Sequence, residues 1–332
     1  MHSVPVEAGG EFIVHEGYVY MGSRYGNKNT LHVIDVHAPK TAKLVSTMRF
    51  KRAIGSLAVR GTTLYASESQ RAINLISLEN PATPDYFDCA LALGKTVYEF
   101  GFVGDFLVAA LNWDGIGIMD VSVPNKAQWV DTLKLEEGYI EHLAVVRDRI
   151  FATCASGGIA VFEIQEAKLV QIASPKGDDF NASSVFVVGE HLWFIGTPEG
   201  KETHIYVIDP NKVDEVLVSF ELDVSAPSTL IDIADGVAVG WNGYTCIGYA
   251  PSQAWARNLF KQHETDEDKV YVETPCDRNA LSEAEIEEIE MLSIMCMDDT
   301  SCVVREGDFI LAAQGDTLNI YSIEEASLLA KR

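Results

Sequence analysis

The chain has 332 residues, 47% of them hydrophobic, and its 49 acidic and 25 basic residues give a formal net charge of -24. Such a charge helps to keep a fold soluble, and it repels phosphate backbones and anionic lipid. We therefore expect no nucleic acid and no membrane among its partners, and charge favours cations, basic proteins and basic peptides. No segment is apolar over the roughly 18 to 20 residues that a membrane helix needs.

Two further features bear on the compartment of the protein. Residues 1–11 lack the charged and apolar regions of a secretory signal, so we expect a cytoplasmic protein, although a mature form with its signal removed would look the same. The six cysteines are scattered and form no Cys-x-x-Cys pair, which is typical neither of a zinc ribbon nor of a disulfide framework. We expect most of them to be buried thiols.

A short apolar strand recurs along the chain, with five copies at intervals of 42, 43, 43 and 46 residues and a sixth near the C-terminus. Each copy carries an apolar pair followed by a polar residue, namely Asp35, Ser77, Asp120, Glu163, Asp209 or Ser322. A period in the forties that is made of strands is typical of an array of β-sheet blades. The repeat therefore predicts one closed unit, although length alone would favour two domains.

The elements between the copies complete the predicted blades in chain order. Each repeat contains an apolar strand, a short turn, a second strand, a polar loop, the recurring strand and a last strand, and Pro39, Pro81, Pro124 and Pro210 follow the recurring strand. We predict an all-β single domain of seven four-stranded antiparallel blades. Their approximate ranges are 11–50, 51–93, 94–135, 136–175, 176–222, 223–252 and 292–332.

An insertion at residues 253–291 interrupts this rhythm between the sixth and seventh blades. Its last part combines a capping box, Ser282 with Glu285, with apolar residues at helical spacing, Ile286, Ile289 and Leu292. We expect a short acidic helix that packs on the ring. It covers either one face of the ring or the mouth of the channel, or it is a decoration with no further role.

The recurring strands resemble the LVIVD repeat of bacterial and archaeal β-propellers. The closest copy is the segment Gly115 to Pro124, and the resemblance covers the first five blades well, the seventh partly and the sixth poorly. The resemblance implies a seven-bladed β-propeller. It implies no particular function, because it brings no catalytic motif and propellers host binding modules and enzymes alike.

Ligands of propellers usually bind at the mouth of the central channel. This face is formed by the loops from outer to inner strands and by the loops between second and third strands. In this chain those loops carry tryptophan, tyrosine, carboxylate and arginine side chains, a mixture that suits a small polar or partly aromatic ligand or a peptide. Polar loop tips are also ordinary in any fold. The predicted ligand-binding residues are Tyr25, Arg71, Trp113, Asp114, His204, Trp241, Asn242 and Tyr244.

His142 beside Glu141 is the best candidate for acid/base chemistry, because histidine titrates near neutral pH and a carboxylate can tune it. Glu99 and Arg52 complete the predicted catalytic set. His142, His204 and Glu99 could approach one another, but no metal-ligand spacing supports a metal site. We expect no metal and no cofactor, since the chain has no His-Glu-x-x-His, Gly-x-Ser-x-Gly or phosphate-loop motif.

These patterns favour a protein-interaction or scaffold module. The alternative is a cofactor-independent enzyme of the acid/base lyase, isomerase or cyclase type, with its active site at the mouth of the channel. A small-ligand binding protein without turnover is a second alternative. The sequence leaves open whether the protein is an enzyme, and it predicts a protein partner or a small organic ligand at the channel mouth.

Overall fold

The computed structural model describes fifteen stretches of the chain, which contain β-strands, turns and two short 3-10 helices. These stretches are residues 2–6, 9–23, 29–68, 72–92, 97–135, 138–154, 158–174, 180–188, 191–198, 204–213, 216–221, 229–234, 237–241, 246–249 and 300–322. They contain no helix that is long and apolar enough to cross a membrane. The predicted insertion helix, within residues 253–291, lies outside them.

The described residues form seven antiparallel sheets, six of four strands and one of three. The first sheet is β2 (Gly9–His15), β3 (Tyr18–Ser23), β4 (Thr30–Asp35) and β5 (Lys43–Arg49). The second is β6 (Ile54–Arg60), β7 (Thr63–Glu68), β8 (Ala72–Ser77) and β9 (Asp85–Ala92). The third is β10 (Phe100–Val103), β11 (Phe106–Ala110), β12 (Ile116–Asp120) and β13 (Gln128–Leu133).

The remaining sheets follow the same order. The fourth is β14 (Ile140–Val146), β15 (Arg149–Cys154), β16 (Gly158–Gln165) and β17 (Lys168–Ala173). The fifth is β18 (Phe180–Val188), β19 (His191–Pro198), β20 (His204–Ile208) and β21 (Val216–Glu221). The sixth is β22 (Thr229–Ala234), β23 (Val237–Trp241) and β24 (Cys246–Tyr249), and the last is β25 (Thr300–Glu306), β26 (Phe309–Gln314), β27 (Thr317–Ser322) and β1 (His2–Pro5).

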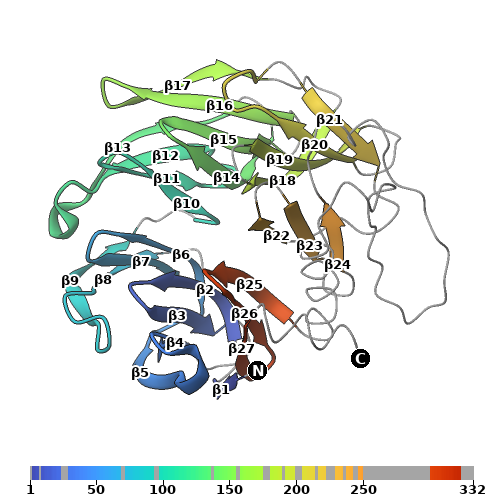
Figure 1. Ribbon diagram of the computed structural model, residues 1–332. Helices are drawn as coiled ribbons and strands as arrows, with labels where there is room; N and C mark the ends of the chain where they lie inside the picture. Colours follow the sequence, from blue (N-terminus) through green and yellow to red (C-terminus); the bar gives the residue numbers. More distant parts are fainter. Residues whose placement is uncertain are drawn as a thin grey trace.

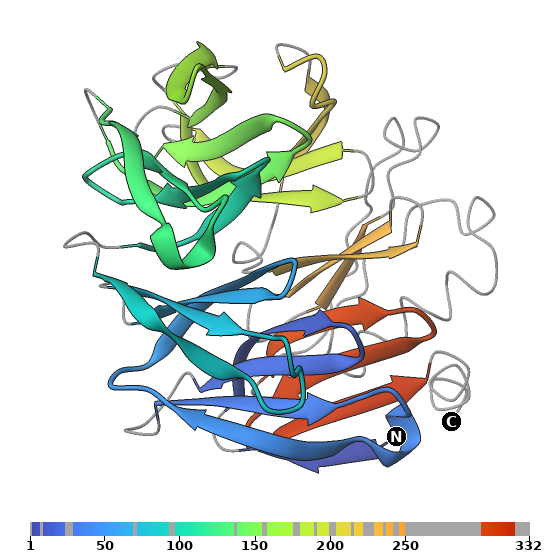
Figure 2. The same ribbon diagram turned by 90° about the vertical axis from the view of Figure 1, so that its left-hand side faces the viewer.

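The sheets are arranged in a ring. The first strand of each sheet contacts the first strand of the next, in the cyclic order β2, β6, β10, β14, β18, β22, β25 and back to β2. Figure 1 shows these strands around the middle of the molecule, with the later strands of each sheet farther out. Figure 2 shows the sheets after a turn of 90°. The predicted all-β architecture of four-stranded antiparallel sheets is confirmed.

The recurring strand of the sequence is the third strand of its sheet in all six copies, because β4, β8, β12, β16, β20 and β27 hold that place. Successive side chains of a strand point to opposite faces of its sheet. In β12, Ile118 packs in a cluster with the fourth sheet, and Met119 packs in a cluster with the second. The two residues of the apolar pair therefore pack against the two neighbouring sheets, and the core lies between the sheets.

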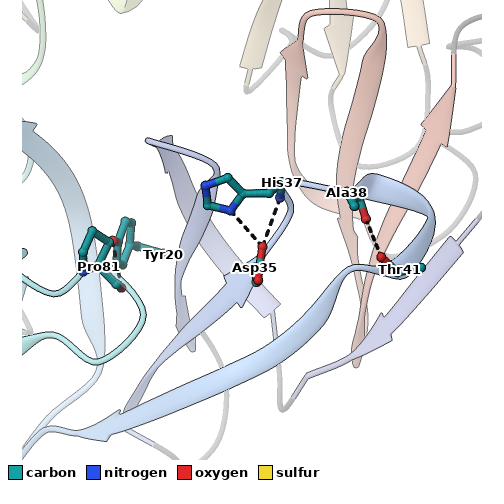
Figure 3. A network of polar contacts seen from close by, with 6 residues as sticks. All are labelled: Tyr20, Asp35, His37, Ala38, Thr41 and Pro81. Atoms are coloured by element: carbon teal, nitrogen blue, oxygen red, sulfur yellow. Dashed lines mark hydrogen bonds and ion pairs between the residues drawn. The ribbon is translucent and has the colours of Figure 1, made fainter.

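The polar residue after the apolar pair lies at or near the end of the third strand: it is the last residue in four copies, Asp209 directly follows β20, and β16 continues past Glu163 to Gln165. Asp35 Oδ1 accepts a hydrogen bond from the amide of His37 at 3.1 Å and lies 2.9 Å from its Nδ1 (Figure 3). The pKa of the Asp35 carboxyl is lowered by these hydrogen bonds. Asp120 and Asp209 accept in the same way from the amides of Ser122, at 2.9 Å, and Asn211, at 2.8 Å. Such local side-chain bonds to the backbone favour a turn over continued strand.

The turn that follows is also a contact between sheets. In the first sheet it contains the 3-10 helix η1 (Pro39–Thr41), and in the third the 3-10 helix η2 (Pro124–Lys126). Tyr20 of β3 is fully buried and donates its hydroxyl to the carbonyl oxygen of Pro81 at 3.0 Å, which joins the first sheet to the second (Figure 3). Arg149 of β15 donates in the same way to Pro210 O of the fifth sheet, at 3.1 Å.

The last sheet joins two distant parts of the chain. Strand β1 pairs with β27, with His2 opposite Ile320 and Pro5 opposite Thr317. Ser3 Oγ donates to Asn319 Oδ1 at 2.7 Å across 316 positions of sequence, and Val4 is buried in the cluster between the last and first sheets. No predicted blade included this strand, which closes the ring by hydrogen bonds between the two ends of the sequence.

Candidate functional site

One face of the ring is defined by the start of β14. The backbone of Ile140 forms an isolated bridge with Asn112, which lies in the loop between β11 and β12. Asn112 N donates to Ile140 O at 2.8 Å, and Ile140 N donates to Asn112 O at 3.2 Å. The loop between second and third strands of the third sheet therefore meets the first strand of the fourth, on the face where the sequence predicted a site.

The loop that carries Trp113 has a defined backbone. Asn112 adopts a left-handed φ of 56°, and Gly115 N donates to Asn112 O at 2.9 Å. Gly115 has a φ of 83°, and a Cβ at this position would lie 2.2 Å from the carbonyl oxygen of Leu133, so only glycine fits. Trp113 is 65% exposed and packs on Tyr139, with ring centroids 4.8 Å apart at an angle of 55°.

Two carboxylates, Glu141 and Glu99, are held at the start of β14 by hydrogen bonds. Asn112 Nδ2 donates to Glu141 Oε1 at 3.0 Å, which links the tryptophan loop to the start of β14. Glu99 directly precedes β10, and its Oε2 accepts from the amide of Leu143 at 2.9 Å. The same oxygen lies 3.3 Å from His142 Nδ1. Three of the four predicted catalytic residues, Glu99, Glu141 and His142, are therefore brought together.

The positions of Glu99 and His142 follow from a shared register. Glu99 directly precedes the pair of Phe100 with Ala109, which begins β10. His142 directly precedes the pair of Leu143 with Ala152, which resumes β14 after a register shift. Glu11 and Ser56 hold the equivalent positions of the first and second sheets, before Phe12 and Leu57. Four consecutive inner strands thus place a polar residue at one height of the ring, and we name Glu11, Ser56, Glu99 and His142 the polar layer.

The pKa of His142 is set by burial and by three nearby carboxylates. Burial acts to lower the pKa of its imidazole, but the hydrogen bond with Glu99 and the charges of Glu99, Glu141 and Glu11 act in the opposite direction. The net effect raises the pKa of His142 above its usual value. Its side chain is 45% exposed, so the group can exchange protons with solvent.

Arg52, the fourth predicted catalytic residue, belongs to a separate contact at the start of the second sheet. Its backbone amide donates to Glu68 Oε1 at 2.8 Å, and Glu68 Oε2 accepts from Asn74 Nδ2 at 3.4 Å. Within the part of the chain that the structure describes, no hydrogen bond or ion pair joins Arg52 to Glu99, Glu141 or His142.

The predicted ligand-binding residues divide into three groups. Trp113 and Asp114 form the exposed turn on the site face, where Asp114 N donates to Leu111 O at 3.1 Å. His204 begins β20, and its ring lies 5.8 Å from that of Tyr206; Trp241 ends β23, opposite Thr229 and Cys246. Tyr25, Arg71, Asn242 and Tyr244 lie outside the described residues.

Tyr139 and Glu11 belong to this face although the predicted set did not include them. Tyr139 lies two positions before Glu141, so the alternation of an extended chain could have pointed to it. Glu11 lies in the first sheet, and only the register of the inner strands relates it to His142.

The surroundings of Cys154 disfavour a reactive thiolate. The Cys154 thiol is buried, and burial raises its pKa to about 11, so the thiol form prevails at neutral pH. Among the described residues, no three His, Cys, Asp or Glu side chains are grouped so that they could hold a metal ion.

Comparisons with known proteins concern the fold. No family model matches the chain, and no curated protein matches it. A chain of the COPII outer coat vertex on membranes is similar over 97% of this chain and 85% of its own, with a TM-score of 0.67 and 10% identity. A protein from Lactobacillus plantarum is similar over 81% of this chain and 86% of its own, with a TM-score of 0.62 and 13% identity.

The computationally designed Ika8 protein is similar over 96% of this chain and 98% of its own, with a TM-score of 0.53 and 12% identity. Likeness at such low identity concerns the fold alone. The structural neighbours are β-propeller proteins, and the LVIVD family is not confirmed. The chain therefore has a β-propeller fold.

Proposed function

We propose that this chain is a protein-interaction module that binds its partner at the ring face carrying Trp113. The observation that carries this proposal is the 65% exposure of Trp113, a large aromatic side chain that packs on Tyr139 from a turn closed by backbone hydrogen bonds. Exposed aromatic side chains on a rigid support are frequent anchors of protein interfaces.

Hydrogen bonds to the fourth sheet hold the loop that carries this anchor. The bridge between Asn112 and Ile140 and the hydrogen bond from Asn112 to Glu141 join the tryptophan loop to the fourth sheet. Binding of a partner there costs little conformational entropy in the loop, because the loop is already hydrogen-bonded to the fourth sheet. A preorganised aromatic anchor between two sheets supports binding to another protein.

The proposal includes the finer architecture. The seven sheets would be the seven blades of one propeller domain, with an LVIVD-like third strand in each repeat and blade boundaries near the predicted ranges. The cyclic contacts among first strands support this part. A cytoplasmic location stays a prediction.

The test is a comparison of partners captured by two variants with matched exposed aromatic changes. Trp113→Ala removes the proposed anchor, and Tyr86→Ala removes an aromatic side chain that is 42% exposed on the outer strand β9. We expect proteins captured from native lysate by the wild type to be lost with Trp113→Ala and retained with Tyr86→Ala. Loss with both variants, or with neither, would contradict a partner site at Trp113.

A second candidate function is acid/base catalysis, favoured by His142 and Glu99. An imidazole 3.3 Å from a carboxylate and partly open to solvent can carry a proton to or from a small substrate. Its test is incubation with a metabolite extract followed by mass spectrometry. Metabolites consumed by the wild type but not by His142→Gln would support catalysis, and identical profiles would contradict it.

A further inference from the structure

We propose that the partner presents an extended basic segment, and that one of its lysine or arginine side chains lies on the Trp113–Tyr139 pair with its charge beside Glu141 and Glu99. This inference deepens the proposed function and rests on it, because it assigns the chemistry of the partner at the same face.

The aromatic pair suits a cationic side chain. The two rings are tilted at 55°, with centroids 4.8 Å apart, and Trp113 leaves 65% of its surface uncovered. The face of an indole ring attracts an ammonium or guanidinium group, and tryptophan is the strongest of the three aromatic side chains in this respect. The aliphatic stem of lysine or arginine can meanwhile cover apolar ring surface.

The carboxylates supply the matching charge. Glu141 uses Oε1 to accept from Asn112 at 3.0 Å, which holds its head group beside the tryptophan loop and leaves Oε2 as the acceptor for an incoming cation. Glu99 is fixed by the amide of Leu143 at 2.9 Å. A cation that reaches this face therefore finds carboxylates already positioned, which lowers the entropic cost of binding.

The whole chain favours the same occupant. Its net charge of -24 draws basic proteins toward it and repels acidic ones. Trp113 lies in an open turn, where a small free cation would keep much of its hydration and gain little. A peptide segment adds backbone and neighbouring side-chain contacts along the face, so a basic segment is the occupant that fits.

His142 makes this binding depend on pH. The charged groups that face it are Glu99 before β10, Glu141 on its own strand β14, and Glu11 on β2. A protonated His142 offsets part of their negative charge, and a neutral His142 does not. Binding of a basic segment should therefore strengthen as pH rises through the pKa of His142 and weaken as pH falls below it.

The experiment uses the full chain and short capped peptides with one central lysine, arginine or glutamate in a glycine/serine background. Binding is followed by nuclear magnetic resonance of the Trp113 indole, assigned with Trp113→Phe, and by calorimetry at low salt. We expect the lysine and arginine peptides to shift the indole signal and the glutamate peptide to leave it unchanged. Trp113→Ala should weaken binding about threefold to thirtyfold, the range expected for one cation–aromatic contact.

A matched pair of charge variants separates local from overall electrostatics. Glu141→Gln removes a carboxylate at the site and keeps an oxygen for Asn112, whereas Asp148→Asn removes an exposed carboxylate from the turn at the other end of the β14–β15 hairpin. Both variants change the net charge equally. We expect Glu141→Gln to weaken peptide binding and Asp148→Asn to leave it near the wild-type value.

The outcomes distinguish this inference from the proposed function. If basic peptides fail to bind while Trp113→Ala still loses partners from lysate, the module stands and the basic segment is wrong. Equal binding of basic and acidic peptides, or equal losses from Glu141→Gln and Asp148→Asn, would also overturn the basic segment. If no partner depends on Trp113 and no peptide binds, both proposals fail.

Discussion

Glu99 and His142 lie on neighbouring sheets and face each other, with Glu99 Oε2 3.3 Å from His142 Nδ1. The same carboxylate oxygen accepts the amide of Leu143 at 2.9 Å, so one side chain before β10 both orients the imidazole and joins the third sheet to the fourth. Glu99 Oε2 therefore takes part both in the pair with His142 and in the contact between the third and fourth sheets.

Replacing Glu99 by glutamine should lower the pKa of His142. Burial acts to lower this pKa, and Glu99 provides the leading opposing contribution through its hydrogen bond and charge. The imidazole signals in a nuclear magnetic resonance titration measure the change. An unchanged pKa of His142 in Glu99→Gln would contradict the assigned role.

The same pair predicts a pH-dependent stability. The folded-state pKa of His142 is raised, so the stability it contributes is fully present below its unfolded pKa of about 6.5 and is lost as pH rises through the folded value. The free energy of unfolding should thus differ more between wild type and Glu99→Gln at pH 5.5 than at pH 9. Denaturant unfolding at both pH values checks this. His142→Gln is the control, since the pH-dependent part should disappear in that background.

Tyr20→Phe should lower the free energy of unfolding by about 1 kcal/mol, because the buried ring would lose its hydrogen bond to Pro81 O. Tyr86 is the matched control: its hydroxyl also donates to a backbone carbonyl, that of Arg49 at 2.7 Å, but the residue is 42% exposed. Tyr86→Phe should cost less, because water can replace the lost bond. Both bonds join the first sheet to the second, so urea unfolding of both variants compares a buried with an exposed bond at one contact, and equal costs would contradict a larger contribution from the buried bond.

Asp35→Ala should cost about 1 kcal/mol at neutral pH, because the turn loses an acceptor for the amide of His37. The lowered pKa of Asp35 sets the sign of the pH dependence: its contribution is present above the unfolded pKa and is lost as pH falls through the folded value. The gap between wild type and variant should therefore shrink in acid, below about pH 3.8. Denaturant unfolding at pH 7 and pH 3 measures it, and a gap that grows in acid would contradict the turn role.

Val4→Ala should cost about 1 to 3 kcal/mol, because Val4 is 3% exposed and packs between the last and first sheets. Val123 is 47% exposed, so Val123→Ala should change the free energy of unfolding by less than about 0.5 kcal/mol. Thermal or denaturant unfolding compares them. If both changes have similarly small effects, β1 does not contribute to the ring in solution.

The sequence predicted the third strands well because their signal is local. In β12, the adjacent residues Ile118 and Met119 pack against two neighbouring sheets, and Asp120, which follows them, stabilises the turn that ends the strand. Three adjacent residues are therefore enough to indicate such a strand. The all-β architecture followed from the spacing of these units. Strand β1 was missed because it is four residues long and its partner β27 lies at the other end of the sequence.

The site was partly predictable for a related reason. Glu141 and His142 stand at the start of an inner strand, a place that the repeat locates, and Glu99 holds the register position of His142 in the preceding sheet. Arg52 also lies near the start of an inner strand, but its amide is bonded to Glu68 within its own sheet. The pairing of Trp113 with Tyr139 depends on contact between two sheets, which no local pattern records.

The pairing of β1 with β27 has a consequence for synthesis of the protein on the ribosome. Ser3 and Asn319 bond to each other across 316 positions, so the N-terminal strand emerges long before its partner is translated. Until then the first sheets can form, but the ring lacks its closing contact and the edge of β1 has no native partner. Pairing of β1 with β27 must therefore be a late and long-range step. We expect the nascent chain to depend on protection of the edge of β1 until β27 has been translated.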